Sequence, residues 1–246
     1  MKDNTVSNIK CTFIFMFVFS SFFIQGNFVF STILYNEKDR NRSLEYITCL
    51  LRNIQHPMID KVIVYYEGKA DDTNSYILNI IKRLPVEIEY ISERPSFGFL
   101  FESLNQLYLD KKIILANADI YFDDSLNSLK DYDLSGKFIA LTRYNEDKKG
   151  NINMWGTIEK PVIHSQDVWI YKAPIAIEAD SIKIGTLTCD GQLAYAANKA
   201  GYKVINPYFS LKSIHLHRIM TKERLSRPYY YDRPTHIMMT VPWSYL

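Results

Sequence analysis

Short apolar runs alternate with stretches whose apolar residues recur at helical spacing. The apolar run at residues 28–35 has strand length, and the stretch that follows it repeats its apolar residues as an amphipathic helix does. The pattern predicts strands at residues 28–35, 61–66, 86–91 and at a run beginning at 112, with helices at 44–54, 72–84 and 99–108 between them. Asn41 or Ser43 is available to cap the first helix. Such alternation is typical of βαβ units, so we expect an α/β single domain with a mostly parallel central sheet flanked by helices.

The second half of the chain continues this pattern less regularly. Further strands are predicted at residues 137–144, 168–171, 204–208 and 213–219, and a helix at 190–200. Gly201 follows that helix and is expected to end it. Residues 145–160 are polar and predict a loop, whereas residues 221–246 form a basic, aromatic and proline-rich tail. We therefore place one domain at residues 28–220.

The N-terminal segment, residues 1–27, contains an uncharged apolar run at positions 11–24. Its length suits a signal peptide, and with the residues that follow it just reaches the length of a signal anchor. We expect the domain to be exported or membrane-anchored, in a secretory-pathway lumen if eukaryotic and membrane-associated if bacterial.

Composition limits the functions that the chain can have. Of 246 residues, 47% are hydrophobic and 23% charged, as in a globular protein. The net charge of +2 argues against a dedicated nucleic-acid-binding protein, which carries a basic face. Three cysteines form neither a disulfide framework nor a zinc site.

Polar residues follow the buried run at residues 113–116. Asn117 and Asp119 come directly after it, and in an extended segment their side chains would share one face. Ligands of open α/β sheets bind outside the carboxyl ends of such strands. Oxygen ligands at this place predict a site where a divalent cation meets a phosphate. A capped strand end followed by an acidic turn would give the same sequence.

Several short motifs follow one another along the chain: Tyr35-Asn36-Glu37, Arg94 to Gly98, Asn117-Ala118-Asp119, Cys189 to Leu193 and Ala200-Gly201-Tyr202. In this order they resemble the motifs of the family 2-like glycosyltransferases, which have the GT-A fold. Tyr35-Asn36-Glu37 resembles the turn that ends their first strand, and the stretch from Arg94 to Gly98 resembles their segment before the metal motif. Asn117-Ala118-Asp119 falls at their Asp-x-Asp, with Asn in place of the first acid. The segment from Cys189 to Leu193, followed by Ala200-Gly201-Tyr202, resembles their acidic helix ending in Gly-Tyr.

The resemblance implies a nucleotide-diphospho-sugar donor, a hydroxyl acceptor on a glycan, lipid or protein, and Mn2+ or Mg2+. Glu37 and Glu67 would contact the nucleoside, and Arg94 a phosphate. Asp119 would be the leading metal ligand, assisted by Asn117 or Asp123. His215 and His217 alternate along a strand and share a face, so one of them would complete the coordination.

The resemblance also implies a base for an inverting transfer. Asp190 would take the proton of the attacking hydroxyl, although a helix N-cap explains an aspartate there equally well. Asp167 is the second candidate, next to residues that suit sugar binding. The sequence leaves two alternatives open. One is a non-catalytic carbohydrate- or partner-binding module on the same fold, which Asn117 favours, and the other is a metal-dependent nucleotidyltransferase.

Overall fold

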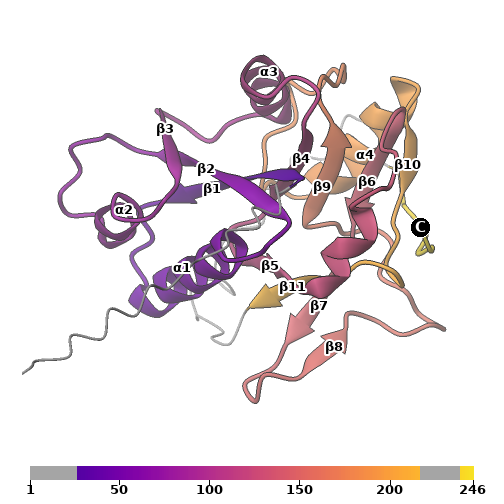
Figure 1. Ribbon diagram of the computed structural model, residues 1–246, viewed down its shortest axis with the longest axis horizontal. Coiled ribbons are helices and arrows are strands. Elements are labelled where there is room, and N and C mark those ends of the chain that lie inside the picture. The colour runs from indigo at the N-terminus through magenta and orange to yellow at the C-terminus, as the bar shows by residue number, and fades with distance from the viewer. Residues whose placement is uncertain (1–26, 217–238) are drawn as a thin grey trace, which may run out of the picture.

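The computed structural model describes residues 27–216 and 239–246, which form two sheets with helices around them (Figure 1). The larger sheet contains β1 (Phe28–Tyr35), β2 (Ile59–Glu67), β3 (Glu87–Ile91), β4 (Lys112–Ala116), β6 (Lys137–Leu141), β9 (Val168–Lys172) and β10 (Lys203–Ile205). The smaller contains β5 (Ile120–Phe122), β7 (Arg143–Glu146), β8 (Ile152–Met154) and β11 (Ser213–Leu216). The helices are α1 (Arg40–Ile54), α2 (Tyr76–Ile81), α3 (Phe97–Leu107), α4 (Cys189–Lys199) and the short 3-10 helix η1 (Asp124–Leu129).

The larger sheet has the strand order β10-β6-β9-β4-β1-β2-β3. Its pairings are parallel except for β9, which runs antiparallel to both β4 and β6. The expected mostly parallel sheet is therefore confirmed. Because β9 runs the other way, its first residues lie at the edge where β4 and β6 end, and this brings residue 167 beside residue 117.

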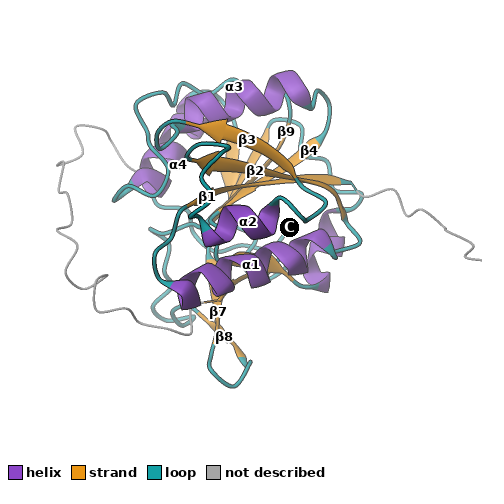
Figure 2. Cartoon of the chain, turned by 90° about the vertical axis from the view of Figure 1, so that its left-hand side faces the viewer, coloured by secondary structure: helices purple, strands orange, loops and turns teal. Residues whose placement is uncertain are grey.

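Helices cover both faces of the larger sheet, with α1 and α2 on one face and α3 and α4 on the other (Figure 2). Strand β1 shows why the sheet is central. Phe30 and Leu34 belong to the core cluster that includes α1 and α2 residues, whereas Val29 and Ile33 belong to the one that includes α3 and α4 residues. A strand buried on both faces is predominantly apolar, as residues 28–35 are apart from Ser31 and Thr32.

The first two helices begin at other residues than the sequence pattern predicted, because of the side chains that cap them. We expected Asn41 or Ser43 to cap the first helix, but Asp39 does so by accepting hydrogen bonds from two backbone N–H groups. The second helix is shorter than predicted because Ser75 caps it, and Asp72 instead accepts from the backbone N–H of Asn74 in a turn.

The described C-terminal residues, 239–246, pack against the domain. Trp243 stacks on Tyr208 with ring centroids 4.0 Å apart, and its indole N–H donates to the carbonyl of Val162. The backbone N–H of Met239 donates to the carbonyl of Gly191 at the start of α4. The final residues thus stabilise the end of the sheet that carries α4.

None of the helices in the described residues has the length and hydropathy of a membrane span. The expected signal peptide or anchor, residues 1–27, lies almost wholly outside the described residues, as does most of the basic tail.

Candidate functional site

Polar side chains gather where β4 ends and β9 begins. The backbone N–H of Asn117 donates to the carbonyl of Asp167 at 3.0 Å, and the backbone N–H of Asp167 donates to the carbonyl of Leu141. Asp167 is therefore fixed between the ends of two parallel strands. Its side chain is only 9% exposed.

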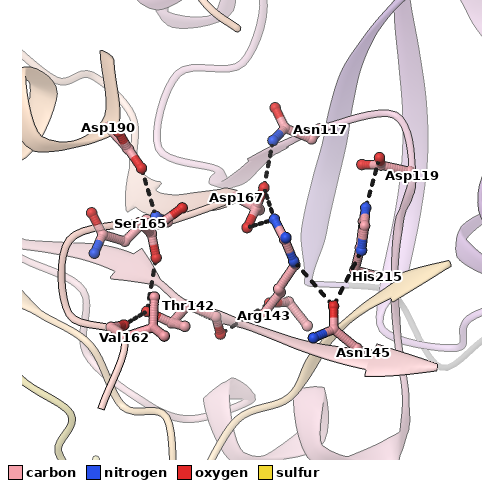
Figure 3. Close-up of polar contacts among 12 residues, drawn as sticks. Asn117, Asp119, Thr142, Arg143, Asn145, Val162, Ser165, Asp167, Asp190 and His215 are labelled. Carbon is pink, nitrogen blue, oxygen red and sulfur yellow. Dashed lines mark hydrogen bonds and ion pairs between the residues drawn. The ribbon is translucent and has the colours of Figure 1, made fainter. Parts of the chain in front are cut away.

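Arg143, at the first position of β7, compensates the charge of Asp167 (Figure 3). Its Nη1 donates to both carboxylate oxygens of Asp167, at 3.0 and 2.8 Å. The Oδ1 atom of Asp167 also accepts from Nδ2 of Asn117 at 2.8 Å. Trp155 packs on the guanidinium, whose carbon lies 3.7 Å from the ring centroid. These contacts give the carboxylate a single orientation.

Asn145 connects this pair to a second one. Its Oδ1 accepts from Nε of Arg143 at 3.2 Å and lies 3.3 Å from Nδ1 of His215. On the other side of the ring, Nε2 of His215 lies 2.9 Å from Oδ2 of Asp119. A continuous chain of polar contacts thus runs from Asn117 to Asp119 (Figure 3).

Asp119 is buried and also forms a very short ion pair with Arg42 of α1. Burial by itself would raise the pKa of Asp119, but His215 and Arg42 outweigh it and hold that pKa well below its usual range. Arg42 in turn donates to Glu45 and to the carbonyl of Leu216. The carboxylate is therefore ionised and held by two cationic or polar partners.

Asp190 lies on the other side of Asp167, in the first turn of α4. Its Oδ2 accepts the backbone N–H of Gln166 at 2.9 Å. The helix is preceded by Thr188 in the left-handed conformation, with φ of 65°, so Thr188 and not Asp190 is the N-cap residue. Burial, with a smaller contribution from the charge of Asp167, raises the pKa of Asp190. A carboxylate with a raised pKa is a better proton acceptor than an ordinary aspartate.

A second group of side chains lies at the ends of β1 and β2. Arg94 donates from Nε to Glu67 at 2.8 Å and lies over the ring of Tyr35, 5.3 Å from its centroid. The Tyr35 hydroxyl donates to Glu37. The structure therefore brings Glu37, Glu67 and Arg94 into one connected group, in which Arg94 pairs with a carboxylate.

One expectation about the first group is wrong. Asn117 and Asp119 do not share a face of an extended segment, because β4 ends at Ala116 and the chain turns, with the Ile120 N–H donating to the Asn117 carbonyl. Their side chains consequently bind different partners. His217 lies outside the described residues, so only His215 of the predicted histidine pair is placed.

Sequence reasoning missed three residues that organise the site: Arg42, Arg143 and Asn145. Arg42 stands in an amphipathic helix where an arginine ordinarily faces solvent, and Arg143 and Asn145 flank the boundary of a predicted strand. The polar residues near the end of that strand were the available signal, since Asn117 also follows directly on the end of a strand.

The site contains carboxylate oxygens and an imidazole nitrogen, which are atom types that bind divalent cations. No group of three or more His, Cys, Asp or Glu side chains is arranged to hold a metal within residues 27–216 and 239–246. Asp119 and His215 supply an oxygen and a nitrogen donor whose direct contact, at 2.9 Å, a cation bound by both would replace. Mg2+ in phosphate-transfer sites takes one or two protein ligands and completes its shell with substrate oxygens and water. A two-ligand site of this type is compatible with the residues present.

No family model matches the sequence, and no curated protein matches it. Solved structures do resemble the fold. A crystal structure of GalNAc-T7 with UDP, GalNAc and Mn2+ superposes with a TM-score of 0.53 over 80% of this chain, at 8% sequence identity. The protein has a GT-A-like glycosyltransferase fold.

Two further structures are similar to this GT-A-like chain at lower TM-scores. The mannosyltransferase PcManGT from Pyrobaculum calidifontis, in complex with GDP-Man and Mn2+, has a TM-score of 0.46 at 10% identity over 78% of this chain. S. aureus TarS 1-349 in complex with UDP-GlcNAc has a TM-score of 0.47 at 12% identity over 81%. The chain spans 45%, 57% and 61% of the lengths of GalNAc-T7, PcManGT and TarS 1-349.

Proposed function

We propose that this protein is a glycosyltransferase that moves a sugar from a nucleotide-diphospho-sugar to a hydroxyl acceptor, with inversion at the anomeric carbon. The observation that carries the proposal is the gathering of Asn117, Asp119, Asp167, Asp190 and His215 at one edge of a GT-A-like sheet. These residues come from distant parts of the sequence. A glycan, lipid or protein is the expected acceptor.

We assign binding of the donor's nucleotide to Glu37, Glu67 and Arg94. The connected group at the ends of β1 and β2 supports this, because nucleotides bind at this edge of open α/β sheets. Carboxylates here accept hydrogen bonds from ribose hydroxyls or base N–H groups. Arg94 pairs with Glu67 and holds the carboxylate of Glu67 in place.

Asp119 and His215 are the proposed protein ligands of Mn2+ or Mg2+, with Asn117 or His217 assisting. When bound, the cation would neutralise charge on the departing diphosphate as a Lewis acid. Arg42 keeps Asp119 ionised and oriented.

Asp190 is the proposed base. Its contact with the Gln166 backbone fixes one oxygen, and its raised pKa suits a group that takes a proton from the acceptor hydroxyl as it attacks. Asp167 is the neighbouring carboxylate whose charge Arg143 compensates, which suits sugar binding better than proton abstraction. Asp190 would thus take the proton, and Asp167 would bind the sugar.

Residues 1–27 would export the domain or anchor it to a membrane, which places the acceptor on the far side. Fusion of residues 1–27 to a reporter enzyme that is active only after export tests this. A reporter that stays inactive would contradict it.

A thermal-shift screen tests the main proposal. The full chain is heated with UDP-, GDP-, CMP- and dTDP-linked sugars, with and without Mn2+. Stabilisation by one nucleotide class that requires metal would support a metal-bridged donor site, because a ligand that binds only the folded state raises its stability. If a folded preparation responds to none of these donors, the binding-module alternative stands in its place.

A further inference from the structure

Arg143 combines three features that an ordinary surface ion pair does not have. Its side chain is only 19% exposed, and its guanidinium pairs with Asp167 and packs on the Trp155 ring. It also holds Asn145, which lies against His215. Arginine is the usual cation for such stacked, forked contacts because its donors lie in one fixed plane.

The fork of Arg143 is only partly used. Nη1 donates to Asp167 and Nε to Asn145, and these are the contacts of its donors in the described part of the chain. The two N–H groups of Nη2 remain. On the partner side, Oδ2 of Asp167 accepts one hydrogen bond and has capacity for another. The ion pair therefore carries one donor group and one acceptor that the contacts among the described residues leave unused.

This pair matches a particular chemical group. Each hydroxyl of a sugar is both a donor and an acceptor, so two adjacent hydroxyls complement a carboxylate oxygen beside a guanidinium N–H. A diphosphate does not match, because Asp167 already neutralises Arg143 and would repel phosphate oxygens. The free donor and acceptor therefore favour a neutral polyol over an anion.

We infer that Arg143 is a positioning residue that shapes Asp167 into a subsite for adjacent hydroxyls of the donor sugar. Asn117 and Trp155 hold the pair in place from the two sides. Without Arg143, the buried carboxylate would lose its main partner, and its orientation would no longer be fixed.

This inference rests on the proposed function, and binding measurements separate the two. Equilibrium dissociation constants are measured by titration calorimetry for UDP against UDP-GlcNAc and for GDP against GDP-mannose, all with Mn2+. In R143A, we expect about a 10-fold weaker affinity for the nucleotide-sugar that the wild type binds, as for loss of one charge-assisted contact. Affinity for the matching nucleoside diphosphate should remain within about 2-fold, because that part of the donor does not touch Arg143.

The R143K variant provides a second test in case R143A does not fold. Lysine keeps the positive charge beside Asp167 but lacks the fork, so the variant should fold and still lose sugar affinity selectively. Arg52 provides a matched control. It lies 4.1 Å over the Tyr121 ring and pairs with Glu146 at 2.7 Å, on α1 and outside the polar chain described above. R52A should leave both affinities unchanged.

Two results would overturn the inference while leaving the proposed function intact. One is equal weakening of nucleoside diphosphate and nucleotide-sugar binding in R143A and R143K, which would make Arg143 a phosphate or purely structural residue. The other is unchanged sugar affinity in both variants. If the wild type binds neither of these nucleotide-sugars nor any other donor of the thermal-shift screen, the proposed function and the subsite fail together.

Discussion

Replacing Asp190 with asparagine removes a proton acceptor but keeps the shape of the side chain. The amide oxygen of asparagine can still accept the Gln166 backbone N–H that Oδ2 accepts at 2.9 Å. The start of α4 should therefore stay in place. Any effect on transfer then reports on chemistry and not on folding.

The expected loss is large for transfer and absent for donor binding. A general base contributes about 10²–10⁴-fold to a rate. This corresponds to about 3–5 kcal/mol of transition-state stabilisation, at 1.36 kcal/mol for each factor of ten. Asp190 has no contact with Asp119 or His215, the proposed metal ligands, so the dissociation constant of the donor should not change.

The raised pKa of Asp190 fixes the sign of the effect on stability. Burial raises this pKa in the folded state, so the contribution of Asp190 to stability is fully present below its unfolded-state pKa and is lost as the pH rises through the folded pKa. At pH 7 the ionised carboxylate is thus a cost to folding, and the neutral asparagine removes it. D190N should melt at the wild-type temperature or slightly above it.

The pH dependence of transfer should have the opposite sign. A base must be ionised, so the wild-type rate should rise with pH through the folded pKa of Asp190, which lies above the ordinary 3.8. This acid limb should be missing from the residual activity of D190N.

The assay measures donor consumption and product formation from pH 4 to 9, with melting curves in parallel. Asp133→Asn is the control, since it changes the net charge equally at an exposed position. Transfer within about 3-fold of wild type in D190N, far short of the loss expected for a base, would refute the assignment. So would a fall in melting temperature that accounts for the loss of activity.

Three further substitutions test other parts of the structure. Asp119→Ala should abolish transfer and metal-dependent nucleotide binding, as nucleotide titrations would show. It should also lower the free energy of unfolding in urea melts by about 3 kcal/mol, because buried Arg42 loses one of its two carboxylate partners and keeps only Glu45. Asn117→Asp should lower the melting temperature at pH 7, because a second carboxylate would face Asp167, and an unchanged or higher value would contradict the contact. Trp243→Ala should cost about 2 kcal/mol in chemical denaturation, from the lost stack on Tyr208 and one hydrogen bond, with unchanged donor affinity.

The sequence predicted the strands of the larger sheet well because they are buried on both faces. Residues 113–116 are a continuous apolar run, and residues 28–35 are apolar except for Ser31 and Thr32. Segments of this kind are strands in a chain of alternating elements. The antiparallel direction of β9 was not predictable in this way. Strand direction depends on pairing with strands distant in the sequence, here β4 and β6. The pattern of apolar residues at 168–171 is the same for either direction.

The candidate site was predictable in part because Asn117 and Asp119 follow a strand end, and in part because a motif resemblance gave Asp190. Asp167 was proposed from its neighbours, and the structure places it next to Gln166, whose backbone N–H donates to Asp190. Arg42 and Arg143 were not predictable, because a buried arginine and an exposed one look the same in a sequence. Only the fold shows which charges they compensate.

The departure at Asn117 from the acidic metal motif has a physical explanation in these contacts. An aspartate at this position would place a second negative charge 2.8 Å from the Oδ1 atom of Asp167, whereas the asparagine amide donates to that atom. Arg143 supplies the positive charge for Asp167, and Arg42 and His215 compensate Asp119. The negative charge of the site is therefore divided between two separately compensated carboxylates. Within the proposed function, Asp119 binds the metal that contacts the diphosphate, and Asp167 binds the sugar. Asn117 allows both carboxylates to stay ionised, because it adds no third negative charge next to Asp167.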